Sequence, residues 1–249
     1  MILGTAAWPE GPGERRALVA RLESGRLADL NRIETLRLRK LGEGEPERLA
    51  EVLVPASLRR LLEGGPRALA RVRQVLAYAE KWDRRGTLPA ALAPDPASVR
   101  LLPCLPRPSR LRRADGVCLD RLQVTGPGAA LDAMPRPTLA ALGGFGGAPA
   151  GFCLALEGGT GATLGAWMVA GWPDGALDLK AGTHRRRIPL AAWEGLALPP
   201  LHAGEALLLP PPRLRPLPEL EPDTEVVLAA PFDTLVLSLG PAARLGTVQ

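Results

Sequence analysis

Proline clustering between residues 87 and 110 is the feature that most limits how this chain can fold. Six prolines lie in this stretch, at positions 89, 94, 96, 103, 106 and 108. Proline lacks a backbone N–H and its ring clashes with the preceding helical turn, so no helix interior can run through the stretch. We therefore predict a linker that carries one short strand, residues 99–102. The linker places a domain boundary between residues 1–97 and 98–249.

The segment before this boundary predicts a small antiparallel sheet followed by helices. Residues 2–7 predict a strand, and Glu23-Ser24-Gly25 separates two apolar runs as a hairpin turn would. From Asn31 onward apolar residues recur at helical spacing, with a break at Pro55 and a new start after Gly65-Pro66. The clearest amphipathic stripe precedes Arg85-Gly86 and consists of Leu69, Val72, Val75, Leu76 and Ala79.

The segment after the boundary predicts strands and turns. Short apolar or alternating runs, separated by Gly and Pro, cover residues 163–172, 176–180, 187–190, 206–209, 225–229, 234–239 and 244–248. This spacing is typical of a β-sandwich or barrel. The proline tract at residues 210–218 predicts a stiff surface loop in preference to a polyproline ligand. With 46% hydrophobic residues available for a core, we predict an α+β fold.

Charge and cysteine usage limit the classes of partner and the compartment. The net charge of +5 favours an anionic partner such as a nucleic acid. The arginine pairs, however, are spread along the chain without an aromatic stacking platform, so nucleic-acid binding is kept only as an alternative. Three separated cysteines without CxxC spacing indicate a reducing compartment. No segment resembles a membrane span or a signal peptide, so we expect a cytoplasmic protein.

Several segments, in their order along the chain, resemble bacterial proteins of the fumarylacetoacetate hydrolase (FAH) superfamily. The Arg-Leu-Ala-Asp-Leu run at residues 26–30 and the proline-rich residues 99–111 resemble the family's N-terminal part. Residues 116–121 lie at the position of its Gly-Leu-Asn-Tyr-x-Asp-His segment. Four further segments resemble its Met-Pro-x-Lys/Arg-Pro, Leu-Gly-Pro-Trp-x-Val, Gly-Asp-Val-Ile and Leu-Lys-Pro-Gly-Asp-Val-Val motifs: residues 134–139, 164–169, 204–208 and 220–227.

The resemblance implies a chemistry whose residues are largely missing here. Family members bind Mg²⁺ or Mn²⁺ through a Glu-x-Glu pair and a later Asp, and a His activates water against a β-dicarbonyl substrate. The His position falls on Arg121, which cannot act as a base near neutral pH. The Glu-x-Glu strand aligns with residues 152–156, which hold no carboxylate, and the substrate-binding Gly-Thr-Pro turn aligns with Pro210-Pro211-Pro212. Between Arg121 and Trp172 only Asp132 and Glu157 are acidic.

These losses predict a divergent or degenerate member: a small N-terminal sheet with helices followed by a shortened FAH-like β domain. We assign no catalytic, cofactor-binding or metal-binding residue, although the family would use Mg or Mn. The leading hypothesis is a non-catalytic subunit or scaffold, assembling with itself or with an active relative and not with a membrane. Two alternatives stay open: an active Mg-dependent hydrolase or decarboxylase of a β-dicarbonyl acid with a relocated site, and a basic nucleic-acid-binding protein.

Four smaller features are interpreted structurally. His184, before three arginines, predicts a solvated charged turn, and His202 predicts a loop histidine without ligand partners. The glycines at 158–161 predict a tight β turn, because a phosphate-binding loop would also need a Lys and a following helix. Cys153 lies in an apolar run and predicts a small buried side chain, not a nucleophile.

Overall fold

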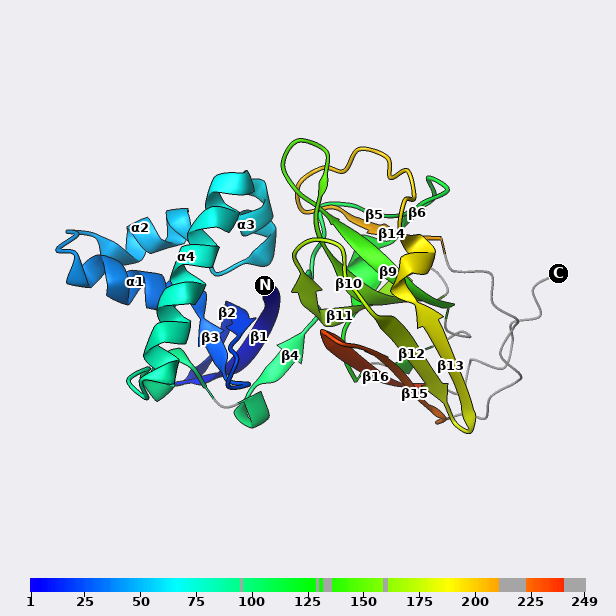
Figure 1. The fold of residues 1–249 in the computed structure, drawn as a ribbon, viewed down its shortest axis with the longest axis horizontal. Helices are drawn as coiled ribbons and strands as arrows, with labels where there is room; N and C mark the ends of the chain where they lie inside the picture. The colour runs from blue at the N-terminus through cyan, green and yellow to red at the C-terminus, as the bar shows by residue number, and fades with distance from the viewer. Residues whose placement is uncertain (95, 129, 132–135, 159–160, 211–222, 240–249) are drawn as a thin grey trace.

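The N-terminal part of the chain is an antiparallel sheet with helices packed on it (Figure 1). The computed structural model describes all residues except 95, 129, 132–135, 159–160, 211–222 and 240–249. Strands β1 (Ile2–Glu10), β2 (Gly13–Arg21) and β3 (Leu27–Asp29) are consecutive antiparallel neighbours. Gly25 between β2 and β3 has φ +87°, a left-handed conformation that glycine tolerates, so the predicted hairpin is confirmed.

Four helices follow, as the apolar spacing predicts: α1 (Leu30–Lys40), α2 (Pro46–Leu53), α3 (Leu58–Glu63) and α4 (Gly65–Arg84). The predicted break at Pro55 separates α2 from α3, and Pro66 lies in the first turn of α4, where its missing N–H has no helical partner to lose. The stripe on α4 buries Val72, Val75 and Ala79 in the N-terminal core.

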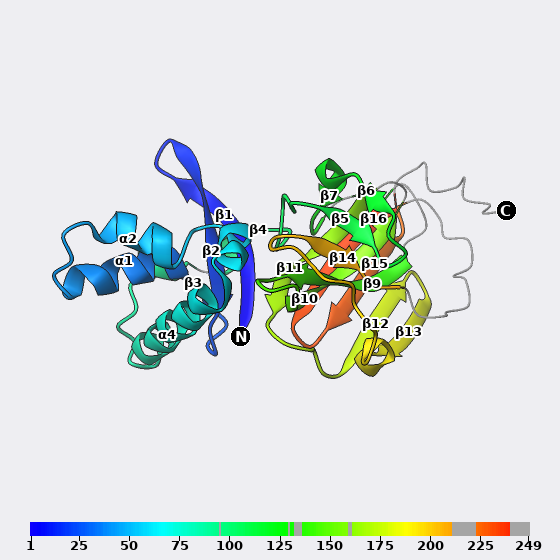
Figure 2. The same ribbon diagram turned by 90° about the horizontal axis from the view of Figure 1, so that it is seen from above.

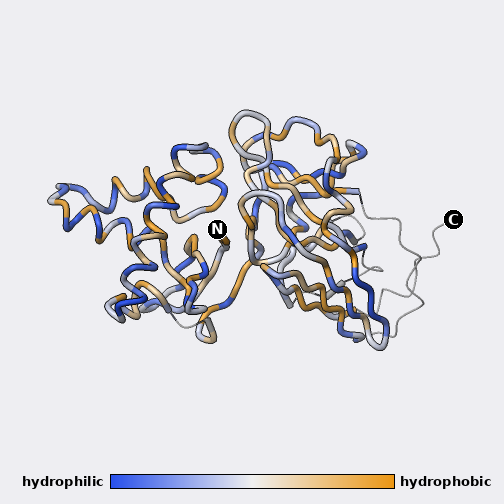
Figure 3. Tube along the Cα trace, viewed as in Figure 1, coloured by the Kyte–Doolittle hydropathy of each residue, from blue (hydrophilic) through white to orange (hydrophobic). Residues whose placement is uncertain are grey.

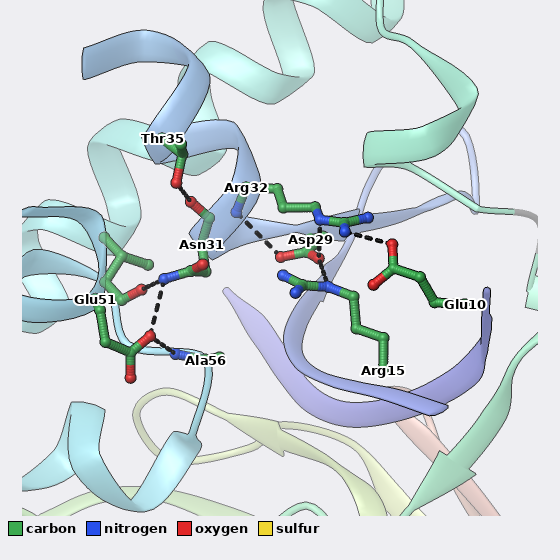
Figure 4. Close-up of polar contacts among 9 residues, drawn as sticks. Glu10, Arg15, Asp29, Asn31, Arg32, Thr35, Glu51 and Ala56 are labelled. Atoms are coloured by element: carbon green, nitrogen blue, oxygen red, sulfur yellow. Dashed lines mark hydrogen bonds and ion pairs between the residues drawn. The ribbon is translucent and has the colours of Figure 1, made fainter. Parts of the chain in front are cut away.

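A buried carboxylate joins this sheet to the first helix (Figure 4). Asp29 ends β3 and caps α1, its Oδ1 accepting a hydrogen bond from the Arg32 backbone N–H at 3.1 Å. Its Oδ2 lies 2.7 Å from Arg15 Nε on β2, and Arg32 also pairs with Glu10 on β1. One fully buried side chain therefore fixes the direction in which α1 leaves the sheet.

The proline-rich stretch is a connection with one strand, as predicted. Strand β4 (Arg100–Leu102) pairs antiparallel with β1, so Ala6 lies opposite Leu101. Two short 3-10 turns, Ala90–Leu92 and Pro96–Ser98, precede it.

The rest of the chain is built from strands. Their bounds are β5 (Leu111–Arg113), β6 (Cys118–Leu119), β7 (Val124–Thr125), β8 (Ala130–Leu131), β9 (Arg136–Gly143), β10 (Pro149–Gly158), β11 (Gly161–Val169), β12 (Ala176–Ala181), β13 (His184–Pro189), β14 (Ala206–Leu208), β15 (Glu225–Ala230) and β16 (Asp233–Leu239). Two further 3-10 turns are Arg121–Gln123 and Leu190–Trp193. The predicted α+β fold is confirmed. The predicted strand at 244–248 and most of the proline tract lie outside the described residues.

Among the described residues the strands form two sheets. The larger has the order β3-β2-β1-β11-β10-β9-β14-β5-β6, with β4 also on β1 and β7 also on β11. The smaller has the order β13-β12-β15-β16-β8. The large sheet runs from the N-terminal strands into the β-rich half, because Gly4 on β1 pairs with Trp167 on β11. In the part of the chain that the structure describes, the four α-helices precede residue 97, while the domain boundary itself stays a prediction.

The β-rich half buries its core between these two sheets (Figure 2). Leu139, Phe152 and Leu154 from β9 and β10 pack in one cluster with Leu177, Leu228 and Leu235 from the smaller sheet. Sheet-on-sheet packing of this kind is a sandwich, as the strand spacing predicts.

Strand β13 corrects one prediction. We expected a turn at His184 and a strand at residues 187–190, whereas the strand starts at His184, which lies opposite Ala181 in the register with β12. β13 is an edge strand with β12 as its one neighbour among the described strands, and its hydrophilic trace is visible in Figure 3. Charged residues such as Arg185 and Arg187 suit such an edge because they oppose further strand pairing.

Among the described residues, no helix is both long enough and apolar enough to cross a bilayer.

Candidate functional site

A pocket of about 200 Å³ lies where four strands of the large sheet reach a common edge. It is lined by residues 113–115 and 208–210 together with Arg136 and Glu157. The pairing of strands β5, β14, β9 and β10 explains why these residues meet. β14 runs parallel to β5, so Leu208 and Arg113 lie opposite each other at their carboxyl ends. β9 runs antiparallel to both β14 and β10, which brings its first residue, Arg136, beside Glu157 near the end of β10.

Hydrogen bonds to backbone groups hold the walls of this pocket. Ala114 N donates to Leu208 O at 3.0 Å, and Asp115 Oδ1 accepts from Val117 N at 3.1 Å, which fixes the turn after β5. On the other side, Trp193 Nε1 donates to Pro210 O at 2.8 Å. Trp193 itself is almost fully buried in the sandwich core, so the segment leaving β14 is anchored to the fold.

The pocket joins segments by which the sequence resembles the FAH superfamily. Arg136 belongs to residues 134–139, and Glu157 directly follows the predicted Glu-x-Glu strand, residues 152–156. Leu208 ends the segment at 204–208, and Asp115 directly precedes Gly116 of the expected His segment. The resemblance named these segments by their order along the chain, and the strand pairing shows that they meet.

Other residues singled out from the sequence lie elsewhere. Arg121, at the expected His position, donates from Nη1 to Ser109 O at 3.1 Å and does not line the pocket. His202 lies in a loop, where its backbone N–H donates to Glu205 Oε2 at 2.9 Å, and His184 lies at the start of β13. Cys153 is fully buried, as predicted, and Asp132 lies outside the described residues. Of the turn predicted at 158–161, Gly158 ends β10 and pairs with Gly161 at the start of β11, and residues 159–160 lie outside the described residues.

Glu157 is the deeply buried carboxylate of this pocket, with 7% of its side chain exposed. Arg113 Nη1 lies 3.4 Å and Arg136 Nη1 3.8 Å from Glu157 Oε1. Arg113 is shared, because it also lies 2.6 Å from Asp115 Oδ2. A buried carboxylate loses its hydration and needs a compensating charge, which these two guanidinium groups supply.

The described pocket residues do not fit a Mg²⁺ or Mn²⁺ site. Such ions prefer several oxygen ligands, commonly two or more carboxylates. Here both lining carboxylates, Glu157 and Asp115, are paired with Arg113, and a guanidinium stays protonated at any ordinary pH. A dication placed among them would face two fixed positive charges. Across the described part of the chain, no three His, Cys, Asp or Glu side chains cluster as metal ligands.

A second buried carboxylate, Asp233, was not predicted from the sequence. Asp233, the first residue of β16, is buried between the sheets and accepts hydrogen bonds from Trp167 N at 3.2 Å and Thr234 N at 2.8 Å. Burial raises the pKa of Asp233 to about 6. A signal existed: Asp233 shares the period-two inward face with Leu235 and Leu237, so alternation places a carboxylate in the core.

Comparison with known proteins defines the class of this fold. No family model and no curated protein matches the sequence. The arrangement of N-terminal strands and helices followed by two packed sheets is that of the FAH superfamily, and solved structures of that fold match over nearly the full chain. The predicted resemblance is thus confirmed at the level of the fold.

Three solved structures illustrate the likeness. Maleylpyruvate hydrolase from Sphingobium sp. SYK-6, solved with manganese(II) and pyruvate, superposes with a TM-score of 0.59 at 12% identity, covering 96% of this chain and 99% of that one. A probable 2-hydroxyhepta-2,4-diene-1,7-dioate isomerase from Mycobacterium abscessus gives 0.57 at 14% identity, covering 96% and 98%. 2-Keto-3-deoxyarabinonate dehydratase gives 0.54 at 12% identity, covering 96% and 99%. At such identities the likeness establishes the fold alone.

Proposed function

We propose that this FAH-fold chain has lost the metal-dependent chemistry of its structural relatives and serves as a non-catalytic subunit or scaffold. Its partner would be a second copy of itself or an active relative, in the reducing environment of the cytoplasm. The observation that carries the proposal is the pairing of Glu157 with Arg113 and Arg136. A metal ion in this pocket would need the buried Glu157 carboxylate as a ligand, but two guanidinium groups lie beside that carboxylate.

The donor set supports the loss of metal binding. Maleylpyruvate hydrolase, which shares this fold, was solved with manganese(II). In this chain the pocket carries two arginines against two carboxylates, and its remaining lining residues are Ala, Leu and Pro. The two arginines cannot take up a proton from water, and both carboxylates are engaged by Arg113.

Two measurements test the catalytic half of the proposal. Titration of the purified protein with Mn²⁺, followed by electron paramagnetic resonance, should show no stoichiometric site. Assays with acylpyruvates and oxaloacetate in excess Mg²⁺ should show no turnover. Mg²⁺-dependent turnover that disappears in Glu157→Gln would overturn the proposal and establish an active hydrolase or decarboxylase.

Light scattering coupled to gel filtration tests the scaffold half. We expect a dimer or larger species, formed either by the chain alone or with a co-expressed active relative. A protein that stays monomeric in both experiments contradicts the subunit role. Salt-dependent retention on heparin and DNA would favour nucleic-acid binding instead.

A further inference from the structure

Arg136 carries a positive charge that the described residues do not fully use. Its side chain is 53% exposed, and its contact with Glu157 is 3.8 Å, longer than a hydrogen bond. Glu157 is its ion-pair partner among the described residues. The planar fork of arginine can hold both oxygens of a carboxylate at once, so Arg136 offers a binding group at the pocket mouth.

Arg113 differs from Arg136 in this respect. It is two-thirds buried, and its two terminal nitrogens already face Asp115 at 2.6 Å and Glu157 at 3.4 Å. These contacts hold the Arg113 guanidinium against the pocket wall. Arg113 is therefore a positioning residue for Glu157, and Arg136 is the group left to face a ligand.

The remaining wall is apolar and small. Ala114, Leu208, Leu209 and Pro210 line it, and the volume of about 200 Å³ equals that of roughly seven water molecules. A short hydrocarbon body fits against this wall.

We propose that this pocket binds a small monoanionic carboxylic acid without a metal ion, its carboxylate on Arg136 and its short apolar body against residues 208–210. Glu157 sets the charge that the pocket accepts. The two arginines and two carboxylates of the lining sum to zero formal charge, so a bound monoanion adds one net negative charge. A dianion would leave a second charge beside the buried Glu157 carboxylate. This inference extends the proposed loss of metal chemistry but does not require the scaffold role.

Isothermal titration calorimetry in EDTA tests the proposal on the full chain. Propionate and butyrate are the monoanionic probes, and succinate and sulfate are the dianionic ones. We expect the monoanions to bind at least tenfold more tightly than the dianions. Arg136→Gln should weaken monoanion binding at least tenfold, and Arg185→Gln, a matched change on exposed β13, should leave it unchanged.

A second variant separates the charge argument from damage to the fold. Glu157→Gln removes the buried negative charge while keeping the side-chain size, so it should strengthen monoanion binding and bring dianion binding to within threefold of it. Circular dichroism confirms that each variant is folded. Absence of monoanion binding, binding that needs added Mn²⁺, or equal binding in Arg136→Gln and wild type would each overturn the inference. Manganese-dependent binding would contradict the proposed function too, whereas the other two outcomes leave it standing.

Discussion

A β-carbon placed on Gly165 would lie 2.1 Å from Oδ2 of Asp233. Gly165 is in the middle of β11, in the Leu-Gly-Ala-Trp run, and Asp233 begins β16 in the other sheet. The glycine lets the carboxylate come close enough to the β11 backbone to accept the hydrogen bond from Trp167 N. This close approach ties the two sheets of the sandwich together.

Gly165→Ala should therefore destabilise the fold. The added methyl group meets a buried carboxylate that cannot move without losing its backbone donors, and overpacking of this kind costs about 1–3 kcal/mol. Urea unfolding measures the change. Gly44→Ala is the control, because a β-carbon there meets nothing within 4 Å, and its stability should equal that of wild type or slightly exceed it. Equal stability of both variants would mean that the sheets adjust freely at this contact.

Asp233 should also make stability depend on pH. Burial raises the pKa of its carboxyl from 3.8 to about 6, so the folded state binds more protons than the unfolded state between these values. Its contribution to stability therefore rises as the pH falls from 6 to 4, by up to about 3 kcal/mol, and is lost as the pH rises through 6.

Comparing Asp233→Asn with wild type in urea at pH 4 to 7 isolates this contribution. The variant's profile must be subtracted from that of wild type, because other groups also change stability with pH. Arginine partners lower the pKa of Glu14, so the contribution of Glu14 falls as the pH falls. Asp178→Asn, at a side chain that is 58% exposed, should give a profile parallel to wild type. An Asp233→Asn profile parallel to wild type would show that the carboxyl titrates normally.

The three cysteines should react with Ellman's reagent at very different rates. Cys118 is exposed, whereas Cys104 and Cys153 are fully buried. The hydrogen bond with Cys104, together with burial, raises the pKa of Cys153 and suppresses its reactive thiolate. We expect a single fast thiol in the native protein and all three in guanidinium chloride. Native Cys118→Ser should show no fast reaction, and a fast thiol in that variant would contradict the burial of the pair.

Asp29→Ala should be among the most damaging single changes in the N-terminal part. It removes the α1 cap and leaves the Arg15 guanidinium, paired at 2.7 Å, without its counter-charge. Breaking a buried pair on one side costs about 3–5 kcal/mol. Asp29→Asn keeps the cap acceptor and should cost less. Thermal unfolding compares both with Arg48→Ala, whose exposed pair with Glu45 contributes about 0.5 kcal/mol or less.

The sequence predicted those elements whose pattern of apolar residues repeats over a few neighbouring positions. The α4 stripe, Val72, Val75 and Ala79, is readable because one face of a long helix repeats within a few residues. β13 was placed three residues late because Arg185 and Arg187 are polar on an edge strand and mask its alternation. Strands β5 to β8 were missed because they have two or three residues each and form through distant partners.

The candidate pocket was predictable only in part. The family resemblance named the segments that contribute Arg136 and Leu208, and Glu157 was one of two acids noted between Arg121 and Trp172. That Arg136 lies opposite Glu157, and that Arg113 reaches the same edge, follows from the β9–β10 register and the parallel β5–β14 pairing. Parallel pairing joins residues far apart in the chain, and no short-range pattern encodes it.

The pairing of β1 with β11 also governs the order in which this protein can assemble. β1 precedes β11 in the chain, and the edge that it pairs with at Trp167 is synthesised only after helices α1 to α4 and the proline-rich connection. Contacts between such distant segments fold slowly. β4 pairs with residues 5–7 of β1, so until β11 emerges residues 2–4 at this edge stay unpaired. A fragment that ends before β11 would keep these backbone groups open to pairing with other chains.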